Sequence, residues 1–167
     1  KTMKKLLILI LCLLATPIAS QRIINMYEQV PYIEQELLQK VAKDYLGPDV
    51  TIYYIHSSPL HPFINGVTHK THHHNYIIQL NSYHQNELDR VKTLLHELGH
   101  VIDGYQGRLT YDPITWDGQS YPDLDWADRP WEQSAIIWSE CLFYEYVIEP
   151  ELKRRGLIPT AGPRIQF

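Results

Sequence analysis

The segment His96-Glu97-Leu98-Gly99-His100 decides how this chain can fold, because its two histidines are four residues apart. In an α-helix, residues i and i+4 lie on the same face, so both imidazole rings can reach one metal ion. Glu97 follows the first histidine directly and can reach a water molecule on that metal. Zn²⁺ accepts neutral imidazole ligands and lowers the pKa of a bound water to about 7. A zinc-dependent hydrolase is therefore our leading hypothesis.

The residues around this segment predict an amphipathic helix over residues 87–105. Apolar side chains recur there at intervals of three and four, as expected when one face of a helix packs against a core. They are Leu88, Val91, Leu94, Leu95, Leu98, Val101 and Ile102. In a chain with 9 histidines, the motif arises by chance with a probability of roughly 3 percent. A helix whose two histidines have no metal role is the alternative.

Length and composition predict one globular domain that does not bind nucleic acid. The chain has 167 residues, of which 44% are hydrophobic and 20% are charged, as in globular proteins. Its 15 basic and 19 acidic residues give a net charge of −4, which becomes −7 without Lys1, Lys4 and Lys5. Nucleic-acid-binding proteins usually carry a basic excess, so we exclude that class.

The first twenty residues are typical of a secretory signal. Lys4 and Lys5 are followed by an apolar run of ten residues, Leu6 to Ala15, and by small residues up to Ser20. The run is too short to span a bilayer comfortably, since a spanning helix needs about 20 residues. We expect residues 1–20 to be a signal peptide. Residues 21–167 would then form one exported domain, periplasmic or secreted, without stable membrane association.

Hydrophobic periodicity and helix-breaking residues predict further helices. One helix is expected over residues 32–46, where Gly47-Pro48 ends it, and a long one over residues 130–147. A short helix is expected over residues 149–156. The tail from Leu157 contains two prolines and a glycine, which favour an irregular course.

Strands are predicted from β-branched and aromatic runs. These runs cover residues 50–55 and 76–80. A β-hairpin is expected over residues 109–121, with its turn at Asp117-Gly118, because both residue types tolerate positive φ. Residues 57–71 are rich in Pro, Gly, Ser and His, and we predict a loop there.

The third ligand of the predicted zinc site is Glu132 in our interpretation, since a catalytic zinc usually has three protein ligands. Arg129 precedes a proline and avoids the helical conformation, so it is expected at the N-cap and Pro130 at the first helical position. Glu132 then projects from the first turn of the helix. Ala135, one turn later, leaves room for close packing against the helix of the two histidines.

Other acidic residues compete for these roles. A carboxylate in a first helical turn is also stabilised by the helix dipole, which would leave Glu132 without a metal role. The rival third ligands are Asp103, Asp128 and Glu140. We expect Asp103, three residues after His100 on the same face, to orient a ligand histidine through its second ring nitrogen. A solvated acid at the helix end is the alternative for that residue.

Three motifs resemble known metallopeptidases. Residues 96–100 with a downstream glutamate are similar to the gluzincin branch of HExxH metallopeptidases. Residues 116–121 (WDGQSY) and 129–135 (RPWEQSA) resemble small single-domain metallopeptidases known largely from phage and bacterial genomes. Residues 96–103 are also similar to the helix of lethal-factor-like and ImmA/IrrE-like peptidases. The resemblance covers about residues 74–147.

The resemblance implies an α+β fold with a minigluzincin-like core: an active-site helix, a ligand-bearing helix and a small mixed sheet. It implies one Zn²⁺ per chain on His96, His100 and Glu132, with Glu97 activating the metal-bound water. In such folds the edge strand of the sheet pairs with an extended substrate. Residues 76–80 are the candidate for that strand, and a core strand without a role in substrate binding is the alternative.

Two further groups of residues are candidates for the site or its surroundings. By resemblance, a tyrosine or histidine stabilises the oxyanion. The candidates are Tyr105, Tyr111 and Tyr121, although spacing cannot select among the 12 tyrosines of the chain.

A cluster of four histidines precedes the second predicted strand: His69, His72, His73 and His74. It is an auxiliary metal site or, as we favour, a solvated loop, because so short a tract fixes no ligand geometry.

The sequence thus predicts an exported zinc metallopeptidase acting on peptide or protein substrates. Export is a departure from the cytosolic phage-type relatives, so a shared substrate does not follow from the resemblance. Two alternatives stay open: a non-catalytic metal-binding or interaction protein on the same fold, and a zinc amidase acting on cell-wall crosslinks. The motif does not separate the two hydrolases, because a metal-activated water attacks either kind of amide.

Overall fold

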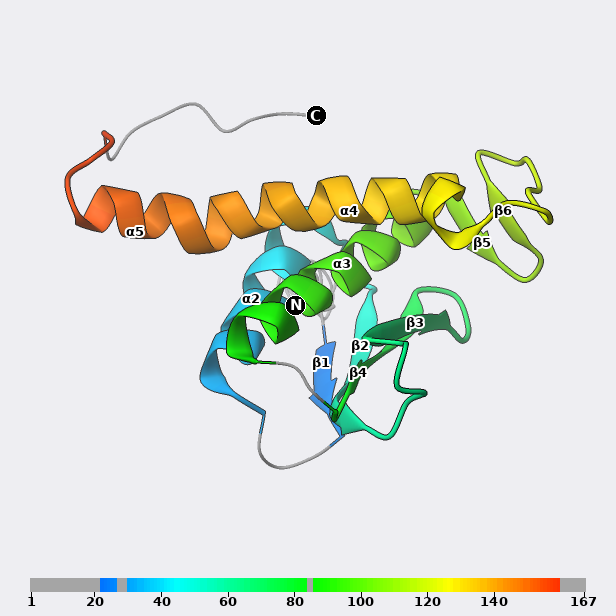
Figure 1. The fold of residues 1–167 in the computed structure, drawn as a ribbon, viewed down its shortest axis with the longest axis horizontal. Coiled ribbons are helices and arrows are strands. Elements are labelled where there is room, and N and C mark those ends of the chain that lie inside the picture. The colour runs from blue at the N-terminus through cyan, green and yellow to red at the C-terminus, as the bar shows by residue number, and fades with distance from the viewer. Residues whose placement is uncertain (1–21, 27–29, 84–85, 160–167) are drawn as a thin grey trace, which may run out of the picture.

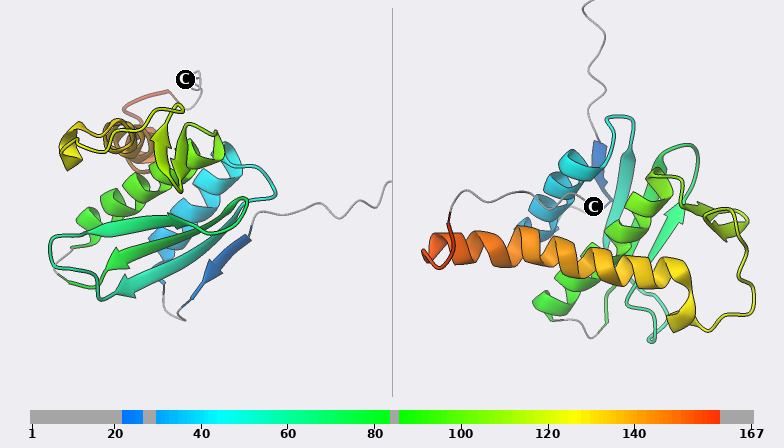
Figure 2. Two further views of the ribbon diagram at one scale, coloured as in Figure 1. Left: turned by 90° about the vertical axis from the view of Figure 1, so that its right-hand side faces the viewer. Right: turned by 90° about the horizontal axis from the view of Figure 1, so that it is seen from above.

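The computed structural model describes residues 22–26, 30–83 and 86–159, so the predicted signal peptide lies outside the described residues. The chain is layered, with a four-stranded sheet at the base, two helices on one face of it, and a long helical rod above them (Figures 1 and 2). The mixed sheet and the helices confirm the predicted α+β class. Within the described ranges, no helix combines the length and apolar character needed to cross a membrane.

The sheet contains three parallel strands and one antiparallel strand. β1 (Arg22–Asn25), β2 (Thr51–Ser58) and β4 (Asn75–Asn81) run parallel, and β3 (Gly66–Lys70) runs antiparallel to β4. The spatial order is β1-β2-β4-β3. The predictions for β2 and β4 are confirmed to within a few residues, whereas β1 had no counterpart in the sequence analysis.

Two predictions about the sheet are wrong. Residues 66–70, placed in a loop, form strand β3, and residues 76–80, expected at the edge, lie in β4 between β2 and β3. The backbone of β4 is therefore paired on both sides, and the two edges of the sheet are formed by β1 and β3. Proline, glycine and histidine residues around β3 led to the loop prediction. An edge strand pairs on one side only and needs few apolar side chains, so its composition can resemble that of a loop.

The helices agree well with the predicted ranges. α2 (Tyr32–Tyr45) and α3 (Glu87–Tyr105) lie on the sheet, and α4 (Pro130–Phe143) crosses above α3. A π-helical segment, η2 (Tyr144–Ile148), and then α5 (Glu149–Arg154) continue α4 in one direction (Figure 1). The predicted helix over 130–147 is thus α-helical as far as Phe143.

Capping groups define both ends of α3. The side chain of Asn86 accepts a hydrogen bond from the backbone N–H of Asp89 at 2.9 Å, as an N-cap residue does. At the other end, Gly107 has a φ of 80° and the N–H of Arg108 donates to the carbonyl of Asp103 at 3.0 Å. A glycine in the left-handed region is a common helix terminator because it has no Cβ.

The predicted hairpin has its turn in a different place. β5 (Leu109–Tyr111) pairs with β6 (Ile114–Trp116), so the chain reverses before Asp117-Gly118. Thr110 closes this earlier loop, since its hydroxyl donates to the carbonyl of Pro113 at 2.7 Å. Both Asp117 and Gly118 have positive φ, as predicted, and their turn is closed by an isolated bridge between Trp116 and Gln119 rather than by a longer pair of strands.

A buried ionic network joins the helices to the sheet. Glu34 on α2 is 2% exposed. Its carboxylate accepts the hydroxyl of Tyr54 at 2.5 Å and the Nε–H of Arg90 at 3.1 Å, and it lies 2.6 Å from Nδ1 of His56. Arg90 on α3 also donates to the carbonyl of Asn81 at 3.2 Å. This network connects α2, α3, β2 and β4 through one carboxylate.

Replacing Glu34 by glutamine is expected to lower the free energy of unfolding by about 3–5 kcal/mol. The cause is that the substitution leaves the guanidinium of Arg90 largely buried without its counter-charge. Urea denaturation followed by circular dichroism measures this difference. The matched control is Glu36→Gln on the same helix, whose ion pair with Lys40 is partly exposed. It is expected to cost less than about 1 kcal/mol. Equal stability of the two variants would contradict a structural role for the network.

Candidate metal centre

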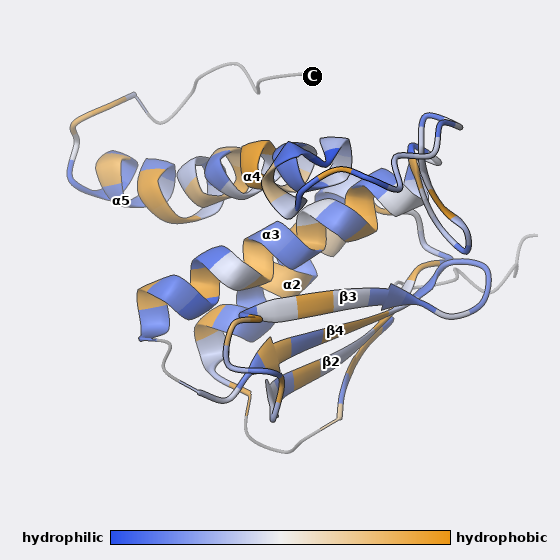
Figure 3. Cartoon of the chain, turned by 45° about the vertical axis from the view of Figure 1, so that its right-hand side comes forward, coloured by the Kyte–Doolittle hydropathy of each residue, from blue (hydrophilic) through white to orange (hydrophobic). Residues whose placement is uncertain are grey.

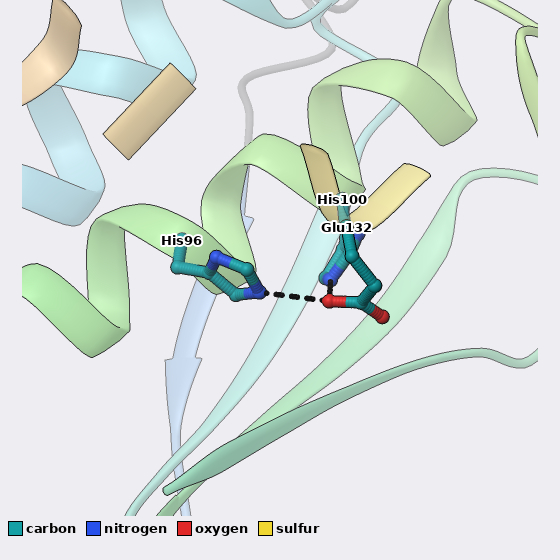
Figure 4. Close-up of side chains that lie close together, drawn as sticks. All are labelled: His96, His100 and Glu132. Carbon is teal, nitrogen blue, oxygen red and sulfur yellow. Dashed lines mark hydrogen bonds and ion pairs between the residues drawn. The ribbon is translucent and has the colours of Figure 1, made fainter. Parts of the chain in front are cut away.

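Three potential metal ligands from α3 and α4 lie together (Figure 4). Oε2 of Glu132 is 3.2 Å from Nε2 of His96 and 3.5 Å from Nε2 of His100. The ligand atoms all lie within 4.8 Å of one another, and no other such group of three is found among the residues that the structure describes. The structure therefore brings together the three predicted ligands, and the group could hold a metal ion.

Small residues allow the two helices to approach this closely. A Cβ added to Gly99 on α3 would lie 2.8 Å from Cβ of Trp138 and 3.1 Å from Cα of Ala135, both on α4. Real side chains do not tolerate the shorter distance, so only glycine fits there. The expected contact between Ala135 and the histidine helix is confirmed.

The start of α4 aims Glu132 at the histidines. Arg129 is the N-cap with extended backbone angles, and Pro130 begins the helix, both as predicted. Glu132 is buried in the first turn. Burial raises the pKa of Glu132, but its hydrogen bonds with His100 and His96 and their charges outweigh that effect and lower the pKa to about 2. The site thus holds an ionised carboxylate, which favours a cation.

The protonation of His100 depends on the same carboxylates. Burial alone would lower the pKa of His100, yet the hydrogen bond to Glu132 and the charges of Glu97, Glu132 and Asp103 raise it. A metal ligand must be the neutral imidazole, so a bound metal would compete with this proton.

Glu97 lies beside the ligand group and is 4% exposed. Burial is the largest influence on Glu97 and raises its pKa, while the charges of His100 and His96 act against it. Glu97 shares with the three ligands a cleft of about 880 Å³, which β3 borders on one side and α4 on the other. The cleft gives a molecule from solution access to both the carboxylate and the ligands.

Two other residues of the cleft were missed by the sequence analysis. Thr68 on β3 donates its hydroxyl to Oε2 of Glu97 at 2.7 Å. Trp126, in the short 3-10 helix η1 (Trp126–Asp128), stacks on His96 with ring centroids 6.2 Å apart and planes at 29°. Neither contact follows from spacing, since both residues are distant in sequence from the histidine motif.

Asp103 does not make the expected hydrogen bond to a ligand histidine. Its Oδ1 accepts Nε1–H of Trp138 at 3.1 Å and lies 3.6 Å from Arg108. Nδ1 of His100 and Oδ2 of Asp103 are both buried, and neither has a hydrogen-bond partner in the described part of the chain. Asp103 therefore pairs with the indole of Trp138 through Oδ1 and makes no hydrogen bond to His100. The other rival ligands, Asp128 and Glu140, also lie outside the three-ligand group.

The three candidate tyrosines occupy different places. Tyr111 lines the cleft, but its hydroxyl donates to the backbone carbonyl of His100 at 2.8 Å. Tyr105 packs against His74, and Tyr121 packs against Trp131 at the border of the cleft, but neither tyrosine is among the residues that line it. The oxyanion assignment of Tyr105 and Tyr121 thus gains no support from their positions.

The histidine cluster before β4 does not form a ligand group within the described residues. His69 lies exposed on β3, and His72 and His73 lie exposed in the turn that follows. His74 pairs instead with Asp49. The arrangement agrees with the solvated interpretation.

Comparisons with models of protein families, with curated proteins and with solved structures find no match. Conclusions about function therefore depend on the geometry of the site.

Replacing Gly99 by alanine is expected to weaken metal binding by about tenfold or more. The added methyl group must move α4 away from α3, and such overpacking typically costs about 1–3 kcal/mol. Competition with a chromophoric chelator measures the affinity. Gly107→Asn is the control, because a Cβ there meets no atom within 4 Å and asparagine tolerates positive φ. Unchanged affinity in the Gly99 variant would show that the helix spacing does not govern the site.

Proposed function

We propose that the protein is an exported zinc-dependent metallopeptidase of the gluzincin type, which hydrolyses peptide bonds. The observation that carries this proposal is the convergence of His96, His100 and Glu132 beside Glu97 in one cleft. A histidine pair alone would fit many roles. A third ligand from a second helix, a nearby buried carboxylate and an accessible cleft together fit a hydrolase.

Zinc is the metal that the ligand set supports. Two imidazole nitrogens and one carboxylate oxygen form a common ligand set of catalytic zinc, with a fourth position left for water. Calcium and magnesium prefer oxygen ligands. Bond lengths of about 2.0–2.2 Å in a tetrahedral site imply ligand atoms about 3.3–3.6 Å apart. The separations of 3.2 Å and 3.5 Å between Glu132 and the histidines agree with that geometry.

The proposed mechanism assigns proton transfer to Glu97. Zinc, when bound, would supply a Lewis acid that acidifies water and polarises a carbonyl group. Glu97 would accept a proton from the attacking water and deliver it to the leaving nitrogen. Burial raises the pKa of Glu97, and a carboxyl with a pKa nearer the working pH is the better proton carrier in both directions.

The surroundings of the cleft favour a peptide in extended form. β3 has an unpaired edge beside the cleft, where the backbone of a substrate could add as a further strand. Phe63, 91% exposed, and Trp126, 53% exposed, also border the cleft. Large apolar side chains exposed around a cleft commonly mark a binding surface. We therefore propose that the substrate presents apolar side chains near the scissile bond.

Zinc content tests the ligand assignment. Both measurements use the mature protein without an affinity tag and with histidines 72–74 replaced. With the candidate site otherwise as in wild type, this protein is expected to retain about one zinc per chain after dialysis. Glu132→Ala is expected to retain far less, because two histidines alone do not complete the site. Elemental analysis measures both. Glu140→Ala is the matched control, since Glu140 is also an α4 carboxylate beside the cleft but lies outside the ligand group. Equal zinc in wild type and Glu132→Ala would refute the assignment.

Replacing Glu97 by glutamine is expected to preserve zinc binding and lower kcat by about 10²–10⁴-fold, the usual contribution of a general acid–base. Cleavage sites are first found by mass spectrometry of a peptide library, and kcat is then measured on one cleaved peptide. Wild-type turnover in this variant would refute the mechanism. Intact peptides together with cleaved peptidoglycan would identify the amidase alternative. A zinc-loaded protein that cleaves neither would favour a non-catalytic metal-binding protein.

A further inference from the structure

The inward face of edge strand β3 departs from the hydrophobic pattern of its neighbour. Gly66 pairs with Leu80 and Thr68 pairs with Ile78, and directly paired residues project toward the same face of a sheet. Leu80 and Ile78 are fully buried beneath the helices. On this face, β3 therefore presents a glycine and a hydroxyl where apolar side chains would be expected. Figure 3 shows β3 at the margin of the sheet, running alongside α3.

Both unusual residues contact Glu97. Oγ1 of Thr68 lies 2.7 Å from Oε2 of Glu97 and 3.1 Å from its backbone carbonyl oxygen. The single hydroxyl hydrogen can thus be donated to the carboxylate. A Cβ added to Gly66 would lie 2.8 Å from Oε1 of the same carboxylate. One oxygen of Glu97 is held by a hydroxyl, and the other faces the space that Gly66 leaves.

We propose that Thr68 is a positioning residue, which holds Oε2 of Glu97 so that Oε1 takes and returns the proton of the attacking water. The inference rests on the proposed peptidase function and extends it to a residue outside the helix motif. A glutamate side chain has several rotatable bonds, and catalysis requires it to stay in one orientation. A hydroxyl at hydrogen-bond distance from Oε2 fixes that orientation and leaves Oε1 free to exchange the proton.

The placement of Thr68 also links substrate binding to the catalytic base. β3 is the strand whose open edge we propose to pair with the substrate, and Thr68 lies in the middle of that strand. A peptide paired with β3 would therefore be placed by the same backbone that places Glu97. β3 would then set the distance between the scissile bond and Glu97, because it binds the substrate at its edge and holds the carboxylate through Thr68.

A valine and a serine variant separate positioning from packing. Thr68→Val keeps the shape of threonine and removes the hydroxyl, whereas Thr68→Ser keeps the hydroxyl and removes the methyl group. We expect kcat of Thr68→Val to fall by about 10–100-fold with KM within about twofold, because a misplaced catalytic group mainly slows the chemical step. Thr68→Ser is expected to stay within about threefold of wild type. Thr71→Val, in the turn after β3, is the control, and its kcat should not change.

A second measurement does not depend on activity. In protein labelled with ¹³C at the glutamate carboxyl carbon, the resonance of Glu97 is the one lost in Glu97→Gln. It is expected to shift in Thr68→Val and to stay close to its wild-type position in Thr68→Ser. Zinc content should be equal in wild type, Thr68→Val and Thr68→Ser, since the hydrogen bonds of Thr68 go to Glu97 and not to the three ligands.

The outcomes distinguish this inference from the proposed function. An active wild-type enzyme with equal kcat in Thr68→Val would overturn the role of Thr68 and leave the peptidase proposal intact. The same conclusion follows if Thr68→Ser is as impaired as Thr68→Val, because packing would then explain the loss. A zinc-loaded wild type that cleaves no peptide would overturn the proposed function and this inference with it.

Discussion

The close approach of α3 and α4 is the constraint on which the candidate site depends. Gly99 and Ala135 let the helix backbones come together, and Glu132 can reach both histidines only at that spacing. The sheet and the cap of α4 determine where the two helices lie relative to this contact. The sheet supports α3 from below, and the cap at Arg129 with Pro130 sets where α4 begins and hence where its first turn projects. The small size of Gly99 and Ala135 is thus a condition for the geometry of the site.

Local patterns predicted α3, its histidine pair and the position of Glu132, because each depends on a few neighbouring residues. The helix period places i and i+4 together, and a proline fixes the start of α4. The sheet order was not accessible in this way. The composition of residues 57–71, rich in Pro, Gly, Ser and His, predicts a loop, whereas Gly66 and Thr68 of β3 lie against Glu97, a contact that composition does not reveal. Likewise, no local pattern predicts the hydrogen bond between the indole of Trp138 and Asp103, because the two residues lie on different helices.

The buried carboxylates of Glu34 and Glu132 differ in how their charges are neutralised. Glu34 has a permanent cation, Arg90, together with hydrogen bonds from the sheet, so this group is complete within the protein. Glu132 faces only histidines, whose charge depends on pH and which bind metals when neutral. The first arrangement suits a structural connection. The second suits a cation that binds from outside.

The open edge of β3 has a consequence for association between copies of the chain. An unpaired strand edge that can accept a peptide can also accept the same edge of another molecule. β3 limits this risk, since it has only five residues and its second half carries the polar side chains of His69 and Lys70. Short length and charged side chains are the features by which natural sheets avoid edge-to-edge pairing. The strand is thus long enough for a short segment of peptide and poorly suited to continuous sheet growth.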